Sequence, residues 1–284
     1  MSLVYVYGIV RAADALPAAA KDASSTRGSG GLGGIAEIGG IAGAPLRLVT
    51  AGPCAAVVTD VPESDFAEAA LNARLGDLEW LGPRAVRHQE ANAAVAGRAS
   101  ALVPLSFGTI FHDDAGVARM LTDERDDLLG RLDTLAGRDE WIAMLRRDLP
   151  VAEAALAADN ASVAALRAEI AAAPPGRGYL LARRLGETMR TELRRQDGEA
   201  AARIVELLTG AGARLFREPL VENGGAGAIV RYSALVATPA ADALAAVARD
   251  FAADWSPRGY ALELSGPWPA YRFATLAPSA TIAT

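Results

Sequence analysis

The sequence of 284 residues contains one cysteine, Cys54, so no disulfide can form within the chain. This scarcity of cysteine favours a reducing, cytoplasmic setting. The sequence also lacks an apolar run of 18 residues, and its start lacks a basic region followed by an apolar stretch. We therefore expect no membrane-spanning helix, no secretion signal and no membrane partner.

Lysine is as scarce as cysteine, and there are two histidines. Lys21 is the one lysine, so a phosphate-binding or Schiff-base lysine would have to be this residue, and no matching motif surrounds it. Half of the residues are apolar, which indicates a folded chain of one or two domains. The net charge of −6 argues against nucleic acid as a partner.

Two partial motifs for a metal or a nucleotide fail in context. His88 and Glu90 match half of the zinc deaminase pattern, but the other half would need a second cysteine after Cys54. Glycines 28, 30 and 33 have the spacing G-x-G-x-x-G, yet they follow a polar segment and no amphipathic helix follows them. We predict no metal and no cofactor.

The remaining candidates for catalysis are equally weak. The triplet at residues 112–114, His-Asp-Asp, follows an apolar segment and could form a site at a strand end. A turn followed by a helix N-cap explains the same residues more simply. No G-x-S-x-G elbow is present. No catalytic residue is assigned, and we predict that the protein is not an enzyme.

The first half of the sequence indicates a mixed α/β domain over residues 1–137. The glycine-rich stretch 28–43 is expected to be a flexible loop that buries few side chains. Residues 102–111 are rich in β-formers and are expected to form a buried central strand. The other expected elements are strands at 3–10, 46–51 and 54–59, the last two joined through Gly52 and Pro53, and helices at 64–75, 83–98 and 116–135.

The second half indicates a ferredoxin-like domain over residues 138–284, with a helical insertion at 151–209. The expected strands are 141–149, 214–221, 228–237 and one beginning at 260, and the expected helices are 151–172, 179–209 and 240–255. The two middle strands flank Asn223-Gly-Gly225, a strong hairpin signal. The order β-α-β-β-α-β is that of the split ferredoxin-like unit, so the predicted fold class is α+β in two domains.

Two segments carry a resemblance to a known family. Residues 104–111 (PLSFGTIF) and 266–273 (GPWPAYRF) resemble the two signature segments of the gas vesicle protein GvpF/GvpL family. Shorter pieces agree in order, at residues 5–10, 60–62, 88–90, 140–141 and 178–180. The family usually has arginine where this chain has Ser106, so no role tied to that arginine is carried over.

The resemblance implies a non-enzymatic accessory or minor structural protein in the cytoplasm, associated with gas vesicles. Such a protein would bind the hydrophobic shell protein GvpA, alone or with other gas vesicle accessory proteins, during vesicle assembly. The alternative is a ferredoxin-like regulatory module that binds a small ligand, which rests on fold analogy. A polar pocket with converging charges would favour the regulatory module, and a shallow apolar surface beside a strand edge would favour assembly.

The segment after Gly266 is the predicted partner-binding surface. Two prolines flank Trp268, remove backbone donors and restrict their neighbours, so the last strand is expected to end at Gly266. A stiff aromatic side chain loses little entropy on contact and suits an interface. We expect Tyr271 and Phe273 to point inward and Arg272 outward, as in a strand. The proposed partner-binding residues are Pro267, Trp268, Pro269, Tyr271, Arg272 and Phe273.

Overall fold

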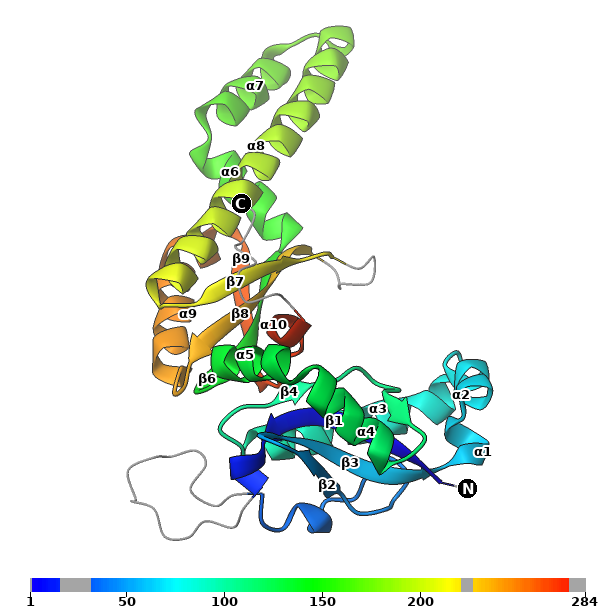
Figure 1. Ribbon diagram of the computed structural model, residues 1–284. Coiled ribbons are helices and arrows are strands. Elements are labelled where there is room, and N and C mark those ends of the chain that lie inside the picture. The colour runs from blue at the N-terminus through cyan, green and yellow to red at the C-terminus, as the bar shows by residue number, and fades with distance from the viewer. Residues whose placement is uncertain (1, 16–31, 221–226, 276–284) are drawn as a thin grey trace. The chain divides into compact units, whose positions relative to one another are not determined.

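The computed structural model describes residues 2–15, 32–220 and 227–275, which form two compact units. The first unit contains residues 2–140 and 267–275, and the second contains residues 141–266. Each unit has one β-sheet with packed helices, so the predicted α+β class is confirmed (Figure 1). No helix among the described residues has the length and apolar character to span a membrane.

The chain passes between the two units twice, once in each of two strands. These strands are β6 (Arg138–Arg147) and β9 (Tyr260–Trp268). The predicted division into 1–137 and 138–284 placed the last described segment with the second domain, whereas compactness groups residues 267–275 with the first unit. The predicted domains, 1–137 and 138–284, are meant as parts that fold independently, and in that sense the division stays a prediction.

The first sheet is built around β1 (Ser2–Arg11), in the order β2-β3-β1-β4. Eight successive residues of β1 are buried, which explains its unbroken apolar sequence. β3 (Cys54–Pro62) pairs antiparallel with β1 and with β2 (Arg47–Ala51). The predicted hairpin between β2 and β3 is confirmed, and Gly52 provides the positive φ of +56° that its turn requires.

Gly8 allows β1 to approach the neighbouring segment closely. The pairing of β1 with β3 shifts register between Val6 and Gly8, as at a β-bulge. A Cβ atom on Gly8 would lie 2.6 Å from Leu102 Cδ1 and 2.8 Å from the carbonyl oxygen of Val103. Only glycine therefore fits at this crossing without a shift of the backbone.

The expected central strand at 102–111 is wrong in both length and place. The structure has two short strands there, β4 (Val103–Pro104) and β5 (Ile110–Phe111), which pair with β1 at the edge of the sheet. Pro104 has no N–H to donate, and Gly108 turns the chain with a φ of +86°. These two residues interrupt the expected strand.

The expectation that the glycine-rich stretch buries few side chains is wrong for the described residues 32–43. Leu32, Ile35 and Ile41 are all less than 7% exposed and belong to the core of the first unit. Ile35 lies in a short 3-10 helix, η2 (Ile35–Glu37). Residues 28–31 lie outside the described part, so the G-x-G-x-x-G spacing is described only at Gly33. Three large aliphatic residues among the glycines hold the segment against the sheet.

Six α-helices accompany the first sheet in the described part of this unit. They are α1 (Glu63–Phe66), α2 (Glu68–Arg74), α3 (Leu78–Ala96), α4 (Asp114–Asp123), α5 (Arg125–Leu135) and α10 (Tyr271–Thr275), with a 3-10 turn η1 (Ala12–Ala15) after β1. The predicted helices 64–75 and 116–135 are each divided in two. α3 begins five residues before the predicted start at Pro83, because Asp77 caps it by accepting from the N–H groups of Glu79 and Trp80.

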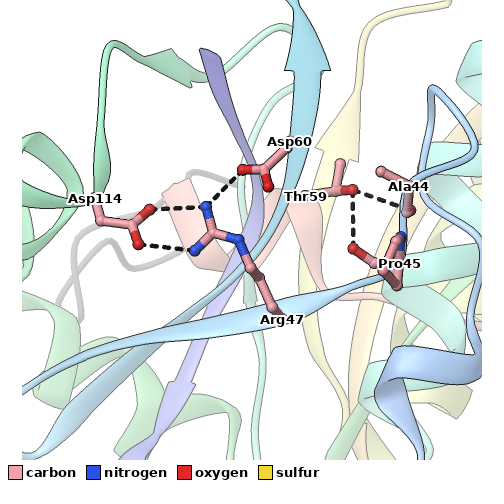
Figure 2. Close-up of polar contacts among 6 residues, drawn as sticks. All are labelled: Ala44, Pro45, Arg47, Thr59, Asp60 and Asp114. Atoms are coloured by element: carbon pink, nitrogen blue, oxygen red, sulfur yellow. Dashed lines mark hydrogen bonds and ion pairs between the residues drawn. The ribbon is translucent and has the colours of Figure 1, made fainter. Parts of the chain in front are cut away.

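An ion-pair cluster on Arg47 connects β2 to α4. Its guanidinium donates two hydrogen bonds to Asp114, at 2.9 and 2.8 Å, and a third to Asp60 at 2.6 Å (Figure 2). The side chain of Asp113 accepts a hydrogen bond from the N–H of Gly116 and caps α4. The simpler interpretation of residues 112–114, a turn and an N-cap, is therefore confirmed.

The second sheet has the order β7-β8-β6-β9, with β7 (Arg214–Glu218) and β8 (Ala228–Ala237). This is the strand order of the predicted β-α-β-β-α-β unit. β7 and β8 pair antiparallel, while Asn223-Gly-Gly225 lies outside the described residues. β6 ends where β8 and β9 begin, since the N–H of Arg147 donates to Gly227 and that of Asp148 to Gly259.

Two helices cover one face of this sheet, α9 (Ala241–Trp255) and the second half of α8 (Pro175–Gly210) (Figure 1). β8 contributes every second residue to their shared core, which follows the two-residue period of a strand. That core contains Val230, Tyr232, Ala234 and Val236 of β8, Ile204 and Leu208 of α8, and Leu244, Val247, Phe251 and Trp255 of α9.

The predicted helix at 151–172 is divided into α6 (Leu149–Asp159) and α7 (Ala161–Ala172). Asn160 separates them, because its side chain accepts from the N–H groups of Ser162 and Val163 and starts the second helix. α7 packs along the first half of α8, and a small apolar cluster with Val163 and Leu193 holds this region.

We predict that the glycine-rich stretch contributes to stability. Leu32→Ala should lower the free energy of unfolding by about 2–4 kcal/mol, because it leaves a cavity in the core. Leu78→Ala is the matched control, since Leu78 is 79% exposed and should change stability by less than about 0.5 kcal/mol. Urea unfolding of both variants measures the difference, and equal effects would contradict the packing of Leu32.

A second prediction concerns Gly266, which lies against the ring of Trp141. A Cβ atom there would lie 2.7 Å from Trp141 Cδ2, so Gly266→Ala should destabilise the protein by about 1–3 kcal/mol. Gly198→Ala, in the middle of α8 with no neighbour within 4 Å of the new Cβ atom, should stabilise it by about 0.5–1 kcal/mol. Thermal unfolding should give melting-temperature shifts of opposite sign.

Candidate functional site

The segment predicted to bind a partner continues β9 and then turns into a short helix. β9 ends at Trp268 rather than at Gly266, and α10 begins at Tyr271. The predicted strand-like alternation of Tyr271, Arg272 and Phe273 is wrong, because these residues form a helical turn. The N–H of Ala274 donates to the carbonyl of Ala270, which closes that turn.

Side chains of this segment divide sharply in exposure. Trp268 is 43% exposed and Pro267 is exposed, whereas Pro269 is buried and Phe273 is 2% exposed. Tyr271 and Arg272 are half-buried. The expectation that Phe273 points inward is confirmed, although a helix rather than a strand directs it. The indole of Trp268 is thus presented next to residues that are fixed in the core.

A buried hydrogen-bonded cluster joins this segment to three other parts of the first unit. We call Tyr5, His88, Asn92 and Tyr271 the tyrosine–histidine cluster. Asn92 Nδ2 donates to the hydroxyl of Tyr271 at 2.8 Å and lies 3.1 Å from His88 Nε2. His88 Nδ1 lies 2.8 Å from the hydroxyl of Tyr5, which also accepts from the N–H of Gly108 at 3.2 Å.

Aromatic rings enclose the imidazole of His88. Tyr7 stacks on it with ring centroids 5.6 Å apart, and Tyr5 and Phe107 make edge contacts. Burial among these rings lowers the pKa of His88 to about 4, so the imidazole is neutral near pH 7. Burial also raises the pKa of Tyr271 to about 12. The imidazole of His88 and the hydroxyl of Tyr271 are therefore both uncharged near pH 7.

The cluster leaves one polar atom unsatisfied. Asn92 is fully buried, and its Oδ1 has no hydrogen-bond partner among the described residues. A buried acceptor without a partner costs about 1–3 kcal/mol.

Both ends of α10 are held by charged side chains of the first unit. The carboxylate of Glu140 accepts from the backbone N–H of Arg272 at 3.0 Å. At the other end, Arg131 donates to the carbonyl oxygen of Ala274 at 2.8 Å. A carboxylate at the first turn and a guanidinium at the last both match the direction of the helix dipole. α10 is thus fixed on the core by more than apolar packing.

The surface beside Trp268 is not a ligand pocket. A hollow of about 30 Å³ lies there, lined by residues of α3, α5 and β6 together with Trp268, Pro269 and Ala270. That volume admits about one water molecule. No small organic ligand fits in this hollow.

A wider hollow of about 670 Å³ lies in the second unit, where β6 ends and β9 begins. Its two arginines are already paired, Arg146 with Glu263 at 2.7 Å and Arg147 with Asp197 at 2.6 Å. Its rim carries Leu149, which is 44% exposed. The carboxylate of Asp148, which also lines the hollow, accepts from the N–H of Val151. Since β9 is the outer strand of the sheet, this hollow lies beside a strand edge, and its charged side chains already have partners within the chain.

Other residue types that could perform chemistry are dispersed. Cys54 is fully buried at the start of β3, and burial raises the pKa of its thiol. In the described ranges, no three histidine, cysteine, aspartate or glutamate side chains lie close enough together to hold a metal ion. Ser106, where the resembling family has arginine, lies exposed in a turn, and its carbonyl accepts from Thr109.

The sequence singles out the segment around Trp268 as a candidate site. It does not indicate that Asn92, Glu140 and Arg131 hold this segment in place. Asn92 carried no motif, although its place four residues after His88 puts both side chains on one helix face. In the sequence, Glu140 is marked only by its place beside Trp141 in a piece that agrees with the family, and nothing there indicates a helix cap. The signal that the sequence offers for this cluster is the presence of two polar residues, His88 and Asn92, on one face of α3.

Comparison with known proteins gives consistent results. A family described as "Gas vesicle synthesis protein GvpL/GvpF" matches residues 3–275. Gas vesicle protein L of Streptomyces sp. (strain CB03234) is 33% identical over 241 residues, which cover 84% of this chain and 86% of that protein. Gas vesicle protein F of the same strain is 27% identical over 269 residues, which cover 95% of this chain and 98% of that protein.

Solved structures show the same fold at low sequence identity. The crystal structure of the gas vesicle protein GvpF from Anabaena sp. PCC7120 has a TM-score of 0.68, with 13% identity, 98% of this chain covered and 100% of that chain. The GvpF structure from Microcystis aeruginosa has a TM-score of 0.61, with 13% identity and 96% and 99% covered.

The neutral state of His88 predicts a pH dependence of stability. Its pKa of about 4 in the folded protein lies below the usual value of 6.5, so the unfolded chain binds more protons between these two values. Stability should therefore be full above pH 6.5 and fall by about 3 kcal/mol as the pH drops to 4.

The measurement is urea unfolding at several pH values between 4 and 7.5. His88→Gln should remove this part of the pH dependence. His112→Gln, at an exposed position after β5, is the control and should keep the wild-type profile. A wild-type profile in His88→Gln would contradict the prediction.

Proposed function

Because this chain belongs to the GvpL/GvpF family of gas vesicle synthesis proteins, we propose that it binds the hydrophobic shell protein GvpA during vesicle assembly. It would act as a non-enzymatic accessory or minor structural protein, alone or with other gas vesicle accessory proteins. Its place would be in the cytoplasm, at the growing vesicle.

One observation carries this proposal, the presentation of Trp268. Its indole is 43% exposed, while Pro269 after it is buried and α10 is fixed at both ends by Glu140 and Arg131. An aromatic side chain on a rigid support loses little conformational entropy when it binds. Such residues are over-represented among the energetically dominant contacts of protein interfaces.

The physical requirement of assembly matches such a surface. Before it is incorporated, a shell subunit exposes apolar surface and strand edges, and both promote aggregation. A partner that covers part of that surface keeps the subunit available for the shell. The exposed side chains of Pro267 and Trp268, with Arg272 nearby, offer apolar contact and a polar margin, as the centre and rim of an interface do.

The alternative of a ligand-binding regulatory module is supported by one observation, the volume of the hollow at the end of β6. That volume of about 670 Å³ is within the range of ligand pockets. The charged side chains that line it, however, already have partners within the chain: Arg146 pairs with Glu263, Arg147 pairs with Asp197, and Asp148 caps α6 by accepting from the N–H of Val151. We therefore rank assembly above regulation.

The test of the proposal is Trp268→Ala. Because the indole is partly exposed, this variant should lose about 1–2 kcal/mol of stability, less than the 3–5 kcal/mol typical of a fully buried tryptophan. Binding to purified shell protein should weaken at least about tenfold, as for an interface residue of high energetic weight. Thermal unfolding and a pull-down with GvpA measure the two effects on the same preparation.

Tyr179→Ala is the matched control for this test, since Tyr179 is an aromatic residue with 72% exposure near the start of α8. It should leave binding unchanged. Trp268→Phe should keep part of the affinity, because an aromatic ring remains. If Trp268→Ala binds GvpA as tightly as the wild type, this segment is not the binding surface.

A further inference from the structure

We infer that the first unit contains a binding site for a single oxyanion, a phosphate or carboxylate group, between α3 and the glycine-rich segment 39–43. A hollow of about 310 Å³ lies there, lined by Gly39, Gly40, Ile41, Gly43, Pro83, Arg84 and Arg87. This site goes beyond the proposed function and does not depend on it.

Arg84 supplies the main cation and is held in a fixed position. Its guanidinium carbon lies 4.2 Å from the ring centroid of Trp80, and its NH1 donates to the carbonyl of Trp80 at 3.0 Å. A stacked, hydrogen-bonded arginine is pre-organised, so it loses little freedom when it binds an anion. Arg87 lies three residues further along α3 and therefore on the same side of the helix.

Arg84 has no counter-ion within the described residues. Its Nε is buried there without a hydrogen-bond partner, and no described carboxylate lies within 4 Å of its guanidinium. The hollow itself has no acidic lining residue. Arg87 pairs with Glu90 at 3.3 Å, but both of these side chains are more than half exposed. A partly buried guanidinium with unused donors is the arrangement that recognises carboxylate and phosphate groups.

The glycine-rich wall of the hollow is also held in place. The N–H of Ile41 donates to the hydroxyl of Tyr7 at 2.7 Å, and the N–H of Gly40 donates to the carbonyl of Ala44. The buried hydroxyl of Thr59 lies 3.1 and 3.0 Å from the carbonyl oxygens of Ala44 and Pro45, to which it donates (Figure 2). This wall is therefore a built surface and not a loose loop.

Glycine leaves room in this wall for a ligand. A Cβ atom on Gly39 or Gly43 would meet no other atom within 4 Å, so open space begins at the backbone. A hollow of about 310 Å³ lies at the lower end of the range for ligand pockets. It suits one anionic group better than a whole nucleotide, and Arg84 can bind such a group with two parallel hydrogen bonds.

The experiment follows the Nε–H resonances of the arginine side chains by 15N NMR of the whole chain at pH 6.5. Sodium phosphate and sodium acetate are titrated separately at constant ionic strength. We expect a saturable shift of the Arg84 resonance with at least one of the two anions. Phosphate alone would identify a phosphoryl group as the ligand, and acetate would identify a carboxylate such as an acidic side chain of a partner.

Variants keep the test specific. Arg84→Gln should weaken binding at least tenfold, and Arg84→Lys should weaken it as well, because lysine cannot form the two parallel hydrogen bonds. Arg119→Gln, which removes an exposed arginine of α4, is the control and should bind as the wild type does. Equal affinity of Arg84→Gln and the wild type would overturn the assignment.

Gly39→Asp tests the site without removing Arg84. The new carboxylate would stand in open space at the wall of the hollow and occupy the site from within the chain. This variant should fold and lose anion binding, while Gly39→Asn should keep most of it. The absence of any saturable shift in the wild type, or unchanged binding in Gly39→Asp, would refute the proposal.

Discussion

The first unit is organised by the need to satisfy two buried tyrosine hydroxyls on its central strand. Tyr5 and Tyr7 are fully buried in β1, and a buried hydroxyl without a partner would be costly. Their partners come from distant parts of the sequence: His88 of α3, the N–H of Gly108 in the edge segment and the N–H of Ile41 in the glycine-rich segment. The two hydroxyl groups thus help to determine which segments pack around β1, since apolar packing alone would distinguish less sharply between segments.

Much of the fold could be predicted where a local signal agreed with the tertiary structure. The hairpin at Gly52 and the strand order of the second unit rest on turn residues and on apolar periodicity, and both are confirmed. Errors arose where one polar side chain overrides a longer pattern. Asn160 divides a predicted helix by capping its second half, and Asp77 starts α3 before Pro83. Both residues are of types that often cap helices, but the sequence contains many other residues of these types that cap no helix. The sequence alone therefore does not show which of them is a cap.

Errors of a second kind came from composition. Glycine content predicted an unpacked loop, yet Leu32, Ile35 and Ile41 are buried, because a few large side chains suffice to fix a segment. The candidate site shows the same limit. The sequence singles out Trp268 and its prolines as a candidate, but α10 depends on Glu140 and Arg131, whose contacts with it are long-range. The pattern of a single sequence contains no information on such distant partners. From the local pattern alone, Tyr271, Arg272 and Phe273 are therefore expected to alternate as in a strand.

The return of the chain to its first unit has a consequence for the order in which the protein is made. Asn92 of α3 receives its partner Tyr271 only after 179 further residues have been synthesised. At roughly 5–20 residues per second, that interval lasts roughly 10–40 seconds on the ribosome. During this time the first-made sheet lacks α10 and the side chain of Phe273, although the chain of the second unit is already emerging. A segment that is made after the whole of the second unit therefore completes the core of the first unit.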